Sequence, residues 1–222
     1  DAMIFGSRTA NDIVSLVNTV ALNSAVREIR VIDNAGSDSD RAVLLGPLTG
    51  AGSSGIVKNG DGILELAASN TYNGATIVTN GALWVNGALN GSANNVVVYS
   101  GGTLGGTGVV YRPVVVATNG AVAPGATNAG TLTVVGNLTF QEGAIFTCLG
   151  GKVQVNGTLT LPTNATVNVV NQGVWTLFSA TALAGATDLG RWRIVGQRNC
   201  RVAIVGTDVV LRMAAGTLFV VH

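Results

Sequence analysis

Residues 60–85 read GDGILELAASNTYNGATIVTNGALWV, and this stretch decides the fold. It contains short apolar or alternating runs of the kind that form β-strands, at Ile63–Leu66, Ala75–Val78 and Leu83–Val85. Turn-forming residues separate these runs at 70–74 and 79–81. Three strands and two turns leave no room for a helix. We therefore interpret the stretch as one coil of a repeating all-β structure.

Turn glycines repeat this pattern along the chain. Gly81, Gly102, Gly120 and Gly143 follow one another at intervals of 21, 18 and 23 residues. A period near twenty suits a β-solenoid, in which each coil of about three strands stacks on the last. About ten coils at roughly 4.8 Å spacing would make a rod near 50 Å long. Three apolar runs are expected at equivalent positions in successive coils: 96–98, 114–116 and 131–135.

The same stretch resembles the autotransporter-associated β-strand repeat, a passenger-type β-solenoid family of bacterial secreted and surface proteins. The matching residues are Gly60, Gly62, Leu64, Leu66, Asn70, Thr71, Tyr72, Gly74, Thr76, Val78, Gly81, Leu83 and Val85. A looser match follows at 101–108, 123–125 and 129–132, and the resemblance extends over about 44–170. It implies a right-handed parallel β-helix outside the cell and implies no chemistry.

We expect one structural domain with three parts: N-terminal strands or a cap over 1–57, regular solenoid over 58–170, and a C-terminal cap or subunit junction over 171–222. The apolar spacing over 11–23 also fits a helix. The last part is rich in arginine and aromatic residues, which could cover the open end of the solenoid, pair with another chain or bind an anionic partner. The expected subunit contacts are Trp175, Trp192, Leu218, Phe219, Val220 and Val221.

Composition argues against several partners. Charged residues make up 10% of the chain and its net charge is +1, which gives no general electrostatic attraction for nucleic acid or anionic membranes. Every apolar run is shorter than the roughly eighteen residues that a membrane helix needs, so we expect no membrane insertion. The expected location is extracellular or at the bacterial cell surface, with any export signal already removed.

The sequence offers little material for catalysis, and we expect no enzyme and no cofactor. Glycoside hydrolysis needs two neighbouring carboxylates, but Glu142 is the only acidic residue between Leu66 and Asp188. The single histidine is His222. The aspartates of residues 33–40 could bind calcium, although a solvated loop explains them better. Cys148 and Cys200 form either a disulfide or two separately buried thiols.

The sequence therefore predicts a non-enzymatic extracellular scaffold that assembles with copies of itself, head-to-tail or laterally, into a surface filament or matrix. An uncharged terminal segment, residues 215–221, supports self-association. The first alternative is an adhesin passenger domain that binds glycans or a host through an aromatic strip of Tyr72, Tyr99, Tyr111 and Trp84. The second is a polysaccharide-active β-helix enzyme, against which the missing carboxylate pair counts.

Overall fold

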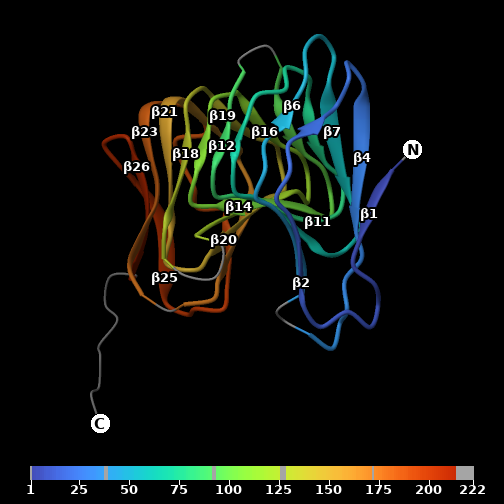
Figure 1. The fold of residues 1–222 in the computed structure, drawn as a ribbon. Coiled ribbons are helices and arrows are strands. Elements are labelled where there is room, and N and C mark those ends of the chain that lie inside the picture. Colours follow the sequence, from blue (N-terminus) through green and yellow to red (C-terminus); the bar gives the residue numbers. More distant parts are fainter. Residues whose placement is uncertain (1, 38–39, 92–93, 126–128, 172, 214–222) are drawn as a thin grey trace.

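A computed structural model describes residues 2–37, 40–91, 94–125, 129–171 and 173–213. Within these ranges every regular element is a strand, and the strands stack as coils of a parallel β-solenoid (Figure 1). The predicted fold class is confirmed. The helix considered over 11–23 is absent, because β2 and β3 lie there. The described residues hold no helix that could cross a membrane.

Three strand columns form the sides of the solenoid. Face 1 contains β1 (Met3–Phe5), β4 (Val26–Val31), β7 (Gly55–Asn59), β10 (Thr76–Val78), β13 (Val96–Val98), β16 (Val114–Val116) and β19 (Leu138–Phe140). Face 2 contains β2 (Ile13–Leu16), β5 (Arg41–Leu44), β8 (Ile63–Leu66), β11 (Gly81–Val85), β14 (Gly102–Gly106), β17 (Ala121–Pro124), β20 (Ala144–Cys148), β22 (Ala165–Val169) and β24 (Arg193–Val195). Face 3 contains β3 (Val20–Ala21), β6 (Leu48–Thr49), β9 (Ser69–Asn70), β12 (Ala88–Leu89), β15 (Val109–Val110) and β18 (Thr131–Val134).

Longer strands complete the last coils. β21 (Lys152–Leu161) pairs with β18 through its first half and with β19 through its second half, so it spans faces 3 and 1. β23 (Trp175–Gly185) stacks on β21 in parallel. β25 (Cys200–Val205) and β26 (Asp208–Met213) then form an antiparallel pair, and β26 pairs with β23. This antiparallel hairpin ends the parallel stack.

The core consists of columns of apolar side chains that point inward at the same register in successive coils. On face 2 one such column is Leu64, Leu83, Leu104, Val122, Phe146 and Val167. Each of these side chains is at most 1% exposed. Alternate residues on the short strands point outward, so the period of two along a strand gives one buried and one wetted side.

Two details differ from the sequence interpretation. Residues 131–134 do not follow 114–116 in the stack, because β16 pairs with β19 and β18 belongs to face 3. The coil after β16 is longer, with 24 residues between Val114 and its partner Leu138, so a fixed period near twenty misplaced it. In the described ranges face 2 stacks nine strands, where about ten coils were expected.

The two ends of the solenoid are built differently. At the C-terminal end, Leu189 and Trp192 are buried, and Trp192 donates a hydrogen bond from Nε1 to the carbonyl oxygen of Pro162 at 3.1 Å. At the N-terminal end, β1, β2 and β3 each pair on one side only within the described part of the chain. One end is therefore covered by its own chain, whereas the other presents strand edges.

Candidate functional surfaces

Asn70, at the start of the Asn70–Gly74 turn, holds neighbouring coils together. It is fully buried on β9, at a position that apolar residues fill in the next coils. Its Oδ1 accepts a hydrogen bond from the amide of Leu48 at 2.9 Å, and its Nδ2 donates to the carbonyl oxygens of Ala68 and Ala88. The side chain therefore links the coil before it and the coil after it, and because it is fully buried with both amide hydrogens donated, it is not available to a ligand.

Lys58 is a buried cation in the core column of face 1, between Ile29 and Val78. Its Nζ donates to the carbonyl oxygens of Asn59 at 3.0 Å, Gly60 at 2.7 Å and Asn80 at 2.9 Å. Burial lowers the pKa of this ammonium to about 8, although the charge of Asp61 raises it in part. All three ammonium donors are used within the corner between faces 1 and 2.

Arg112 plays the same part at the corner between faces 3 and 1. It is fully buried and donates to the carbonyl oxygens of Tyr72, Gly74 and Asn90, with 2.5 Å from Nη1 to Gly74. Its guanidinium also lies 4.6 Å from the ring centroid of Tyr72. Burial raises the pKa of Tyr72 to about 12, and its hydroxyl is 2.6 Å from Thr76 Oγ1. Arg112 thus bridges three coils.

Glu142, the acid that an enzyme of this kind would need, is also engaged. Its carboxylate accepts hydrogen bonds from the amides of Thr163 and Asn164, at 2.8 and 3.0 Å, and from both side chains. The amide of Thr163 is the main reason why the pKa of Glu142 lies below its usual value. A carboxylate held in the ionised form is a poor general acid. Glu142 therefore fits a role in linking turns of adjacent coils.

The two cysteines are free thiols in this structure. Cys148 is buried on β20, where burial raises the pKa of the thiol. Cys200 is half-buried at the start of β25, and its Sγ lies 3.5 Å from Met213 Sδ. The structure therefore has two separate thiols, of which only Cys148 lies in the core.

The residues expected at subunit contacts have different environments. Trp192 is buried by its own chain and covers the end of the solenoid. Trp175 is half-buried, and its Nε1 donates to the carbonyl oxygen of Asn171 at 2.9 Å. Leu218, Phe219, Val220 and Val221 lie outside the described residues. Trp175 is therefore the one expected contact residue in the described part whose side chain keeps some exposure.

The four aromatic residues considered for sugar stacking do not form a strip. Tyr72 is fully buried beneath Arg112. Tyr99 and Tyr111 are 48% and 44% exposed, but they follow strands of different faces. Trp84 lies on face 2, 5.8 Å from the guanidinium carbon of Arg41. Since the side chains are distributed over separate sides of the solenoid, they offer no continuous stacking surface.

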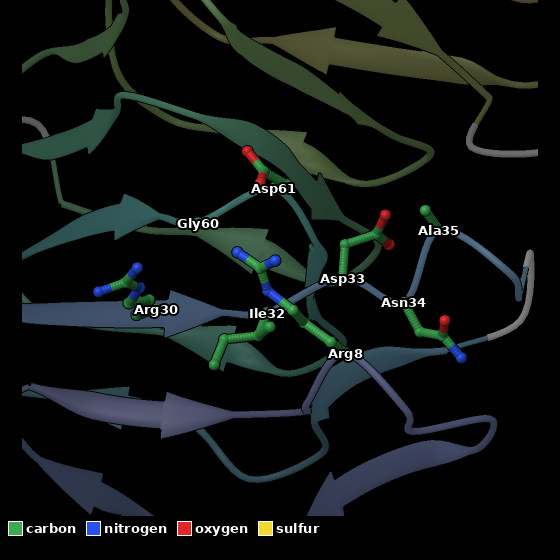
Figure 2. A pocket seen from close by; sticks show the side chains of 8 residues that line it. All are labelled: Arg8, Arg30, Ile32, Asp33, Asn34, Ala35, Gly60 and Asp61. Carbon is green, nitrogen blue, oxygen red and sulfur yellow. The ribbon is translucent and has the colours of Figure 1, made fainter.

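A charged cleft of about 470 Å³ lies near the N-terminal end (Figure 2). It is lined by Arg8, Arg30, Ile32, Asp33, Asn34, Ala35, Gly60 and Asp61. These residues come from the β1–β2 connection, the end of β4 with the loop after it, and the β7–β8 turn. Figure 2 shows the guanidinium of Arg8 between Arg30 and the two aspartates. Three successive coils therefore bring two cations and two carboxylates to one cleft.

The charges in this cleft are not equally engaged. Asp61 accepts a hydrogen bond from Asn80 Nδ2, and Asp33 also has an interaction partner. Asn34 is fixed by donating from Nδ2 to the carbonyl oxygen of Ala10 at 2.9 Å. In contrast, Arg8 and Arg30 are exposed, and neither forms a hydrogen bond or ion pair with the described residues. The cleft therefore presents two guanidinium groups whose donors are available.

Sequence reasoning missed this cleft, because the coils at the N-terminal end are longer than twenty residues. Val26 on β4 pairs with Gly55 on β7, which are 29 positions apart. Asp33 and Asp61, separated by 28 positions, therefore fall at one corner. The clue was available in the alternating run 27–33, because its last two charged residues, Arg30 and Asp33, both line the cleft. Among the described residues no group of three or more metal-ligating side chains could hold a metal ion.

The second surface without a partner is the open core at the N-terminal end. Val14 is 42% exposed, whereas Ala42, its register partner one coil further in, is 1% exposed. Inward residues of the first coil, Met3, Phe5, Leu16 and Val20, are half-buried, although their partners Ile29, Val31, Leu44 and Leu48 are nearly completely buried. The hydrophobic core thus reaches the surface at this end.

Comparison with known proteins gives one family match. Residues 56–85 match the passenger-associated-transport-repeat, so the predicted resemblance is confirmed over the stretch that carries it. The matched segment includes Lys58, Asn70 and Tyr72, whose side chains are all buried. The buried part of the repeat therefore corresponds to coil structure, while Gly60 and Asp61 of the same segment line the charged cleft.

Two relatives share part of the chain. The adhesin BmaC autotransporter of Brucella suis biovar 1 is 38% identical over 92 residues, which cover 41% of this chain and 3% of the relative. An extracellular serine protease of Serratia marcescens is 40% identical over 96 residues, which cover 42% of this chain and 8% of the relative. The similarity thus spans a small fraction of each relative's length.

Proposed function

We propose that this chain, in which residues 56–85 form a passenger-associated-transport-repeat, is a non-enzymatic scaffold displayed outside the bacterial cell. The polar side chains of the matched coil support a scaffold role. Lys58 and Asn70 are buried and hydrogen-bonded to backbone of neighbouring coils, so they stabilise the stack and contact no solvent. The similarity to an autotransporter adhesin and an extracellular protease supports the extracellular location.

The scaffold associates with copies of itself through the open N-terminal end, and this surface carries the proposal. Half-exposed core side chains and the free edges of β1 to β3 favour the addition of another strand. The sequence of the uncharged segment 215–221 makes it the proposed partner of these edges in a second copy. Because the contact joins two different surfaces, repetition gives a head-to-tail filament rather than a closed dimer.

Sedimentation velocity over a range of protein concentrations, with negative-stain imaging, tests self-association. The double variant Val14→Lys and Val17→Lys places charges on the open end, where both side chains are already exposed. We expect it to remain monomeric, as should a chain that ends at Met213. The matched control Leu45→Lys and Val135→Lys changes exposed apolar residues on the sides and should assemble like the wild type. A wild-type protein that stays monomeric at every concentration contradicts self-association and leaves the open end for a further coil of the same polypeptide.

An adhesin that binds surface glycans is the second candidate, and the charged cleft favours it. One relative is named an adhesin, and the cleft is within the size range of small-molecule sites, roughly 300–1,000 Å³. A glycan array tests this function, because saturable binding of a defined sugar supports an adhesin.

Glycoside hydrolysis would use the carboxylates of Asp33 and Asp61 in the same cleft. Release of new reducing ends from a polysaccharide would therefore contradict the non-enzymatic proposal.

A further inference from the structure

We propose that the cleft between Arg8, Arg30, Asp33 and Asp61 binds the carboxylate of an acidic saccharide, such as a uronic acid unit. This inference rests on the adhesive candidate function and names its ligand class. It begins with the two arginines. Their guanidinium groups are exposed, line one cleft and form no hydrogen bond or ion pair with the described residues.

Guanidinium groups bind carboxylates well, because each can donate two parallel hydrogen bonds to the two oxygens. Other arginines of the chain are already engaged, since Arg41 pairs with Glu65 at 3.0 Å. Arg112 is buried and bound to backbone carbonyl oxygens. Arg8 and Arg30 are thus cations with free donors that face a cavity, in a chain that is otherwise poor in charge.

The two carboxylates of the cleft decide between a saccharide and a simple anion. A ligand that carried only negative charge would be repelled by Asp33 and Asp61. A uronic acid also has hydroxyl groups, and an ionised carboxylate accepts hydrogen bonds from hydroxyl groups strongly. The cleft therefore combines donors for the carboxylate of the ligand with acceptors for its hydroxyl groups. Ile32 adds an apolar surface for the carbon face of the ring.

The cleft is also held in shape by the fold. Gly60 has a φ of 76°, and an added Cβ would overlap the carbonyl oxygen of Val31 and lie 3.1 Å from Arg30 Cγ. The aliphatic part of Arg30 can therefore lie against the turn only because this residue is glycine. The backbone N–H of Asn34 donates a hydrogen bond to Asp40 Oδ2 at 3.0 Å, which fixes the loop that carries Asp33. Binding would consequently need little rearrangement of the backbone.

Isothermal titration with oligogalacturonate, and with a neutral oligogalactose of the same length, tests the proposal. We expect saturable binding of the acidic oligomer that weakens with added salt, and at least tenfold weaker binding of the neutral one. Arg8→Gln with Arg30→Gln should weaken binding of the acidic oligomer at least tenfold. The matched control is Arg193→Gln with Arg212→Gln, which removes two exposed charges near the other end and should leave affinity unchanged.

The double variant Asp33→Asn and Asp61→Asn tests whether the cleft recognises a saccharide or any small anion. The affinity for oligogalacturonate relative to that for acetate should fall, because the charged acceptors of hydroxyl groups are gone. If this relative affinity rises or does not change, the saccharide assignment is wrong. It is also wrong if the control Arg193→Gln with Arg212→Gln loses as much binding as Arg8→Gln with Arg30→Gln. Circular dichroism and the midpoint of thermal unfolding establish that each variant is folded. The cleft variants should sediment like the wild type. A negative result in the binding experiment would therefore not affect the test of self-association.

Discussion

Arg112 shows how single residues hold the coils of this solenoid together. The guanidinium takes the place of water for the carbonyl oxygens of Tyr72, Gly74 and Asn90 at a corner where the coils change direction. Burial lowers the pKa of Arg112, and the hydrogen bonds to the carbonyl oxygens compensate for the lost hydration of the guanidinium. The same arrangement recurs at Lys58, which donates to three carbonyl oxygens in another corner.

Replacing Arg112 by methionine should destabilise the protein strongly. The variant keeps much of the side-chain volume but leaves three carbonyl oxygens without donors, at a cost of about 3 kcal/mol in the free energy of unfolding. Urea denaturation followed by circular dichroism measures this. Arg41→Met is the matched control, because it removes a half-exposed ion pair with Glu65 and should cost about 1 kcal/mol or less. Equal losses in the two variants would argue against the bridging role of Arg112.

Lys58 should make stability depend on pH in the alkaline range. Its folded pKa is about 8 and its ordinary value is 10.5, so between these values the unfolded chain binds more protons and stability rises with pH. The rise should reach about 1–2 kcal/mol by about pH 9.5. The comparison stops there, because the raised pKa of Tyr72 has the opposite effect above about pH 10. Urea denaturation at several pH values should show the rise in the wild type and not in Lys58→Met.

At the scale of the coil, close contact between successive turns limits which residues fit. Gly74 closes the turn before β10, and an added Cβ there would overlap the carbonyl oxygens of Ser53 and Ser54. Its φ is not positive, so the constraint is space rather than backbone conformation. This explains why the motif of residues 70–74 ends in glycine.

Gly74→Ala should therefore destabilise the protein by about 1–3 kcal/mol, because the coils must move apart to admit the methyl group. Thermal unfolding measures the change. Gly36→Ala is a suitable control, since among the described residues its added Cβ would meet only Asn34 Oδ1, at 3.4 Å. If Gly36→Ala destabilises the protein as much as Gly74→Ala, the loss of stability comes from restricting the backbone of a glycine and not from close contact between coils.

Strand positions followed from the sequence more readily than side-chain roles. The run 63–66 became β8, because alternation on a short strand reflects one buried and one exposed side. Lys58 and Arg112 were not recognised as core residues, since a charged side chain in a strand pattern is normally exposed. The cleft of Arg8 and Asp61 was also missed. It depends on coils of 28 or 29 residues, whereas the visible period was near twenty.

At the scale of the whole molecule, the solenoid has a direction. Its C-terminal end is covered by Trp192 and by the antiparallel hairpin of β25 and β26, which interrupts parallel stacking. Its N-terminal end leaves core side chains partly exposed. The charged cleft opens beside that uncovered end. Adhesion and self-association would therefore involve neighbouring but separate surfaces, and each can be changed without the other.

The direction of the solenoid gives a prediction about where the core is stable. Leu16 and Leu44 occupy the same register position in the first and second coils, but Leu44 is 1% exposed and Leu16 is half-buried. Leu44→Ala should cost about 2–5 kcal/mol at any protein concentration, because it leaves a cavity in a closed core. Leu16→Ala should cost clearly less in dilute solution. If copies assemble over the open end as proposed, Leu16 would become buried, and binding would stabilise the folded state by mass action. Chemical denaturation at low and high protein concentration should therefore show that the effect of Leu16→Ala grows with concentration while that of Leu44→Ala does not. A constant difference between the two variants would mean that no second copy covers the first coil.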